Sequence, residues 1–284
     1  MPLTYLDQNA LIKLGVQARQ SQFRRKIDSA LASGCLNVVV SSWHLIETAH
    51  SARLEPALEL AEFIESLRPA WLFERHDLLK IEVSEDFFKF ASIPYPVTPR
   101  VTTRSAVIAA LSNKPDGPRF DIPAQRFVKQ WWENPDQLRP LEIRYQENAD
   151  NLIRLRELTK QAKITIDIRN NANRLLLKHT VPTTTPSGVA VGREVRDSYI
   201  AQARVESIPT FSIENAISEQ EWSAQGGTDR NTLIDKFHLI SALPYVDEIV
   251  SDDGFFHKIY PVARAAGHVK ANLLKNAEFL SRFP

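Results

Sequence analysis

The sequence predicts an α/β protein in which helices cover a mainly parallel sheet. Short apolar runs are typical of buried strands, amphipathic segments have helical spacing, and the two patterns alternate near both ends of the chain. The chain has 284 residues, of which 43% are hydrophobic, so it can form a substantial core. Its nine glycines are few for a β-sandwich or for a glycine-rich phosphate-binding protein.

The first 68 residues alternate between strand and helix patterns. The expected order is a strand at Leu3–Leu6, a helix over 10–31 that ends by Gly34, a strand at 35–40, a helix capped by Ser41 and Ser42, and a helix over 54–67. Strands that alternate with helices in this way favour parallel pairing.

The middle and the end of the chain differ in pattern. Six prolines between 94 and 123 predict loops, followed by a helix that starts near Pro123, a long helical stretch over 141–177, a loop over 180–187 and helices over 189–205 and 213–222. The α/β pattern then returns as a helix over 231–243, a strand at 246–250, a helix from Phe255 and a short strand at 269–271.

Five acids occupy similar places in these elements. Asp7 ends the first strand, Glu47 lies about one turn into the helix after the second strand, and Asp235 lies early in a late helix. Asp252 and Asp253 end the strand that follows that helix. The carboxyl ends of parallel strands form the ligand crevice of an open α/β sheet, so we expect these side chains to converge there.

Carboxylates that converge repel one another, and a divalent cation removes this cost. Oxygen ligands suit Mg²⁺ or Mn²⁺, whereas histidine and cysteine with zinc-site spacing are absent from the sequence. Each acid also has an ordinary structural reading: an N-cap for Asp7, a solvated helix face for Glu47, the positive helix end for Asp235, and a turn for Asp252 and Asp253. Their shared context favours the metal site.

The motifs that hold these acids resemble those of PIN-domain nucleases. The matching segments are YLDQN at 5–9, VVSS at 39–42 leading to ETA at 47–49, DKFHLISA at 235–242 and IVSDDGFF at 249–256. The family has an Asp after its first strand, a Glu after its second, a late helical Asp and then Thr/Ser-x-Asp-x-x-Phe. This pattern favours Asp253 over Asp252, which becomes an auxiliary ligand.

The resemblance implies a PIN-like three-layer αβα core over 1–68 and 228–284, with a mostly helical insertion at 69–227. It implies a metal-dependent endonuclease in which Asp7, Glu47, Asp235 and Asp253 hold Mg²⁺ or Mn²⁺. Asn9 and Ser251 would orient carboxylates or water. His238 shares a helix face with Asp235. A contact with the scissile phosphate or the metal, a contact behind the ligands, and a structural role are all open for it.

The motifs allow more than one substrate and more than one kind of partner. The resemblance favours RNA over DNA as substrate, and it raises a homodimer and an antitoxin-type protein as partners, although no motif supports either one. The alternatives are a DNA-directed nuclease of genome defence and an inactive PIN-like module that binds nucleic acid or protein. No apolar run is long enough for a membrane span, and the single cysteine suits a reducing cytoplasm.

Basic and aromatic residues supply weaker signals. Arg24, Arg25 and Lys26 form a basic stripe that is a candidate nucleic-acid contact. A charged helix face is more often simply solvated. Trp131 and Trp132 favour core packing over base stacking.

Overall fold

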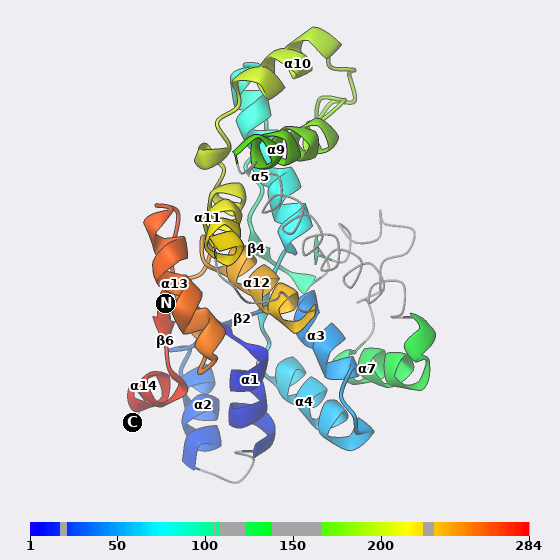
Figure 1. The fold of residues 1–284 in the computed structure, drawn as a ribbon. Coiled ribbons are helices and arrows are strands. Elements are labelled where there is room, and N and C mark those ends of the chain that lie inside the picture. The colour runs from blue at the N-terminus through cyan, green and yellow to red at the C-terminus, as the bar shows by residue number, and fades with distance from the viewer. Residues whose placement is uncertain (18–21, 105, 108–122, 138–165, 224–229, 284) are drawn as a thin grey trace.

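The computed structural model describes residues 1–17, 22–104, 106–107, 123–137, 166–223 and 230–283 (Figure 1). Its centre is a six-stranded sheet in the order β4-β3-β2-β1-β5-β6. The strands are β1 (Leu3–Leu6), β2 (Asn37–Ser41), β3 (Ala70–Leu72), β4 (Val101–Thr102), β5 (Glu248–Val250) and β6 (Asn272–Leu274). All neighbouring pairs are parallel except β3 and β4, which pair antiparallel. The expected α/β class with a mainly parallel sheet is therefore confirmed.

The strand order changes direction beside β1. From β1 the chain continues to β2 and β3 on one side of it, whereas β5 and β6 add on the other side. The register pairs Leu6 with Val250, so the carboxyl ends of β1 and β5 are adjacent. In an open α/β sheet this is the topological switch point, where ligands bind.

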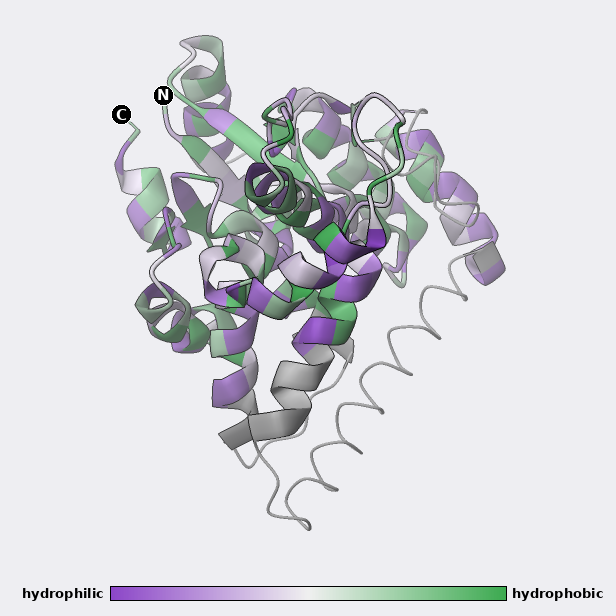
Figure 2. Ribbon diagram, turned by 90° about the horizontal axis from the view of Figure 1, so that it is seen from above, coloured by the Kyte–Doolittle hydropathy of each residue, from purple (hydrophilic) through white to green (hydrophobic). Residues whose placement is uncertain are grey.

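The helices fall into two groups that pack among themselves. The bounds of the first group are α1 (Gln8–Leu11), the π-helical η1 (Ile12–Gln17), α2 (Gln22–Ala32), α3 (Ser42–Ala49), α4 (Leu54–Ser66) and α7 (Ala124–Glu133). The second group comprises α5 (Arg75–Phe90), α11 (Pro209–Ser223), α12 (Arg230–Ala242) and α13 (Gly254–Ala265). This grouping is compatible with a three-layer αβα fold. Figure 2 shows the hydrophobic strand nearest the N-terminus surrounded by helices.

A second hydrophobic core lies away from the sheet. The remaining elements are η2 (Pro135–Gln137), α9 (Ile166–Thr180), α10 (Arg193–Gln202), η3 (Val205–Ser207) and α14 (Asn276–Ser281). Phe87, Phe88, Leu177 and Tyr199 join α5, α9 and α10 in this separate cluster. Figure 1 places α9 and α10 at one end of the molecule, opposite α2 and α14.

The chain between 69 and 227 contributes to both cores. Its strands β3 and β4 extend the central sheet, because Trp71 and Leu72 are buried there and pair with Thr102 and Val101. Its later helices build the second cluster. The expected insertion thus includes two sheet strands as well as helices, and the expected helical residues 141–165 lie outside the described residues.

Two local expectations were wrong in detail. The last strand is β6, three residues later than expected, because the backbone N–H groups of Lys270 and Ala271 donate to the Leu243 carbonyl at the end of α12. The first helix is not continuous α-helix, since η1 follows α1 directly. Within the described residues, no helix is both long and apolar enough to cross a membrane.

Candidate functional site

Asp7 is held where β1 and β5 end. It follows β1 as the N-cap of α1, and its Oδ1 accepts a hydrogen bond from the backbone N–H of Ala10 at 2.5 Å. Its own backbone N–H donates to the Val250 carbonyl over 3.1 Å, and the Ser251 hydroxyl donates to its Oδ2. Both carboxylate oxygens are therefore oriented at the switch point of the sheet.

Asp253 is tied to Asp7 through Ser251. The Ser251 hydroxyl, which donates to Asp7, accepts the backbone N–H of Asp253 at 2.9 Å. Asp253 is the N-cap of α13, and its Oδ1 accepts from the Phe255 N–H at 2.6 Å. Ser251, which is fully buried, thus connects the two acids that follow the adjacent strands.

Asp252 belongs to a different set of contacts. Its Oδ2 lies 2.9 Å from Nζ of Lys13 and 2.8 Å from Nδ2 of Asn276, and its Oδ1 accepts the Asn276 backbone N–H at 3.0 Å. Burial tends to raise the pKa of Asp252, but the hydrogen bonds from Lys13 and Asn276 and the charge of Lys13 together outweigh it, so the pKa is lowered. Asp252 is an ionised partner of Lys13 and is not joined to Asp7 as Asp253 is.

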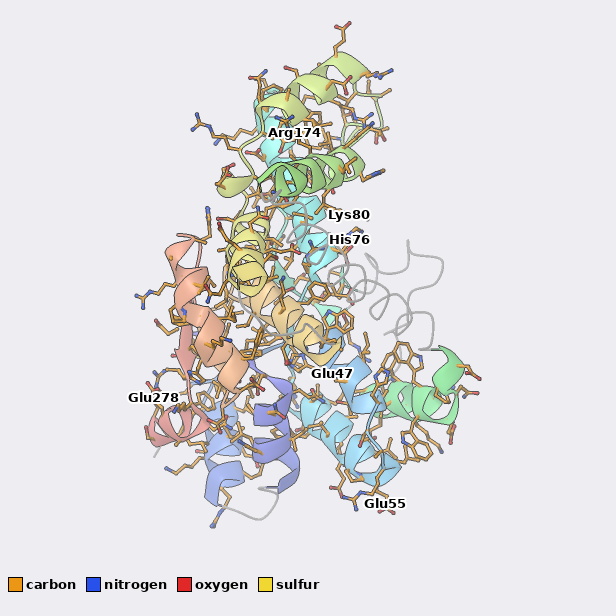
Figure 3. The ribbon with its side chains drawn as sticks, in the orientation of Figure 1. Glu47, Glu55, His76, Lys80, Arg174 and Glu278 are labelled. Carbon is orange, nitrogen blue, oxygen red and sulfur yellow. The ribbon has the colours of Figure 1, made fainter. Side chains whose placement is uncertain are left out.

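Glu47 joins α3 to α12 through His238. Its Oε2 is 3.1 Å from Nε2 of His238, whose side chain is 3% exposed against 23% for Glu47. Burial tends to raise the pKa of Glu47, but the nearby His238, through its charge and hydrogen bond, lowers it. In Figure 3, Glu47 lies in the middle of the molecule beside α12, whereas Glu55 and Glu278 lie at the periphery.

Asp235 shares α12 with His238 and carries the largest electrostatic cost of the group. Burial, followed by repulsion from Glu47, raises the pKa of Asp235 to about 7, with further repulsion from Asp253 and Asp7. Since these charges act on one another, the structure brings the four predicted acids into one electrostatic neighbourhood.

The pKa of Asp7 is also displaced. Burial raises it to about 6, although the hydrogen bonds from Ser251 and Ala10 favour the ionised form. Asp253 repels Asp7, and His238 attracts it. Among the described residues, no lysine or arginine forms an ion pair with Asp7 or Asp253. The protein itself therefore supplies little counter-charge at this point.

The donor chemistry fits a hard divalent cation. Asp7, Glu47, Asp235 and Asp253 offer carboxylate oxygens, and their mutual repulsion is a cost that such a cation would offset. In the part of the chain that the structure describes, no three histidine, cysteine, aspartate or glutamate side chains are already gathered tightly enough to hold a metal ion. Some side-chain movement would have to accompany binding.

Other predicted site residues make different contacts or are exposed. Asn9 has an exposed side chain. Arg24 pairs with Asp28 at 2.9 Å and stacks over a ring in α4, and Lys26 donates to the Phe283 carbonyl. Lys26 also lines a cavity beside the amino end of β1, at the opposite end of that strand from Asp7.

Three residues of the site were not expected from the sequence. They are Tyr5, His44 and Ser41, each at most 1% exposed. Tyr5 and His44 contact the ring of His238, and Ser41 contacts Tyr5. His44 accepts the Ser41 backbone N–H at 2.9 Å through Nδ1, so its Nε2 donates to the Leu6 carbonyl at 2.8 Å. Burial lowers the pKa of His44 to about 4. The aromatic residue within the first strand was the available signal for Tyr5.

The chain matches no protein-family model, no curated protein and no solved structure. The resemblance to PIN-domain nucleases therefore stays a prediction that rests on the motifs.

Proposed function

We propose that this protein is a Mg²⁺- or Mn²⁺-dependent nuclease with a PIN-like core. The observation that carries the proposal is the raised pKa of two aspartates, Asp7 and Asp235, beside Glu47 and Asp253 at the switch point of the sheet. Carboxyl groups that lie together against their mutual repulsion, with no lysine or arginine ion pair to Asp7 or Asp253 among the described residues, are suited to a divalent cation.

Asp7, Glu47, Asp235 and Asp253 are the residues that would hold the cation. When bound, it would supply a water of lowered pKa and offset the charge that develops on a phosphodiester. Ser251 keeps one oxygen of Asp7 turned toward β5, and the N-cap bonds hold Asp7 and Asp253 at the helix starts. No side-chain nucleophile is required, because the attacking group is water.

RNA is the substrate that we favour, as the resemblance implies. Exposed cations on helices beyond the site support a polyanionic substrate, among them Lys80 on α5, with Arg174 and Lys178 one turn apart on α9. Figure 3 shows that Lys80 lies between Glu47 and the end of the molecule formed by α9 and α10, and that Arg174 lies at that end. Contacts of this kind bind phosphates irrespective of base sequence.

The proposal is tested by cleavage of mixed RNA, single-stranded DNA and duplex DNA by the full chain in Mn²⁺. We expect wild type to cleave RNA. The cleavage rate of Asp7→Asn or Glu47→Gln should fall about 100-fold or more, since loss of a ligand removes several kcal/mol of charge stabilisation. Glu55→Gln changes an exposed acid on α4 and should cleave like wild type.

Equal cleavage by wild type and Asp7→Asn would overturn the assignment of the site. Cleavage of DNA but not RNA would favour the DNA-directed alternative. Absence of both Mn²⁺ binding and cleavage in the wild-type chain would favour the inactive binding module.

A further inference from the structure

A chain of buried polar side chains leads from the second strand to Glu47. The Ser41 hydroxyl is 3.2 Å from the Tyr5 hydroxyl, which contacts Nδ1 of His238. The opposite ring nitrogen of His238, Nε2, lies 3.1 Å from Oε2 of Glu47. The three residues behind Glu47 are each at most 3% exposed. Residues of β1, β2 and α12 thus converge on one carboxylate in α3.

The donors and acceptors in this series of hydrogen bonds can be assigned from the chemistry of the groups. An ionised carboxylate can only accept, so Nε2 of His238 must carry the proton that it donates to Glu47. In a neutral ring Nδ1 then accepts, and the Tyr5 hydroxyl must donate to it. Tyr5 in turn is left to accept from Ser41. With a neutral ring this arrangement satisfies every member of the chain, and a protonated ring would keep the same Nε2–H bond to the ionised Glu47.

Rings on either side limit the freedom of His238. Its centroid lies 5.8 Å from that of Tyr5, and 5.0 Å from that of His44 in an edge-on contact. His44 is itself bonded to the backbone of Ser41 and Leu6. The imidazole therefore has a defined position as well as a defined tautomer.

We propose that Tyr5 and His238 are positioning residues that hold the Glu47 carboxylate in the geometry required for cation binding. The inference rests on the proposed function, and it adds Tyr5, which the sequence did not single out, to the groups that act behind the ligands. Groups behind the ligands of a metal site commonly change metal affinity 10- to 100-fold when they are removed. Tyr5 touches neither substrate nor reacting atoms, so its effect passes through His238.

The first test measures Mn²⁺ affinity by calorimetry on the full chain. Tyr5→Phe removes only the hydroxyl, and we expect it to weaken Mn²⁺ binding about 10-fold. Tyr199→Phe is the matched control: it removes a hydroxyl bonded to Asp86 at 2.8 Å in the second core, and the affinity should not change. Circular dichroism confirms that each variant is folded.

His238 provides a graded pair of variants. His238→Gln keeps an N–H near the position of Nε2, whereas His238→Asn removes the donor to Glu47. We expect Asn to weaken Mn²⁺ binding more than Gln. Unchanged affinity in both Tyr5→Phe and His238→Asn would overturn the proposal.

A second measurement uses the metal-free wild-type protein, so it does not depend on the folding of a variant. Nitrogen-15 NMR of the imidazoles in metal-free wild type should show His238 with its proton on Nε2. A ring protonated on Nδ1 alone would overturn the proposal, because Nε2 would then have no proton to donate to Glu47. If wild type binds no Mn²⁺, the proposed function fails, and the NMR result still decides whether the chain of hydrogen bonds exists.

Discussion

Asp7 caps a helix and belongs to the acidic group at the same time. As an N-cap it accepts from Ala10, its other oxygen accepts from Ser251, and the charge of Asp253 repels it. The sequence predicted the places of Asp7, Ser251 and Asp253, because strand ends and helix starts have local signals. The contact between Tyr5 and His238 spans 233 positions of the chain, and local patterns contain no information on it.

Removing the Asp235 charge should stabilise the metal-free protein in a pH-dependent way. The folded-state pKa of Asp235 is about 7, above its ordinary value of 3.8, so the folded chain keeps a proton that the unfolded chain has lost between these values. The contribution of this group to the free energy of unfolding therefore decreases as the pH rises from 3.8 to about 7, and above pH 7 it stays at its low value. At pH 8 in EDTA, we expect Asp235→Asn to raise the free energy of unfolding by about 1 kcal/mol, discounted for partial exposure.

Urea denaturation at pH 5, 6, 7 and 8 measures this difference. At pH 5 the folded carboxyl group is still protonated while the unfolded one is mostly ionised, so the advantage of Asp235→Asn should be smaller than at pH 7, and it should change little between pH 7 and 8. Glu55→Gln serves as the exposed control and should show no such trend. A difference between wild type and Asp235→Asn that is constant with pH would contradict the raised pKa.

Strands and helices were predicted from the sequence where the apolar run or the helical spacing was long enough to be recognised. The buried runs of β1 and β2 and the helices α3, α4 and α12 lie close to their expected positions. β3 has three residues and β4 has two, too few for alternation to be visible. They join the sheet through pairing with distant strands, which sequence patterns do not specify.

Gly15 shows how an element depends on close approach. It lies in η1, where a methyl group would overlap the ring of Phe63 in α4. We expect Gly15→Ala to lower the free energy of unfolding by about 1–3 kcal/mol, because overpacking forces the helices apart. Gly254→Ala, where an added methyl group would meet no atom within 4 Å beyond the adjacent residues and the backbone of its own helix, should be neutral or slightly stabilising. Thermal unfolding of both variants measures the contrast, and equal melting temperatures would contradict the packing.

The whole molecule combines a predicted sheet with a second core that was not predicted. Alternation at both ends indicated parallel strands, and the switch point follows from their order. The cluster around Phe87 and Tyr199 joins α5 to α9 and α10, which lie far from it in the sequence, so local patterns do not indicate it. The sequence therefore placed the acids better than it placed what surrounds them.

The most direct measurement is the anomalous scattering of Mn²⁺ in crystals of the full chain. We expect a peak among the carboxylates of Asp7, Asp235 and Asp253, with Glu47 bound directly or through water, and loss of the peak in Asp7→Asn. A well-occupied crystal with no peak at this edge of the sheet, or with a peak that persists in Asp7→Asn, would contradict a metal centre formed by these acids.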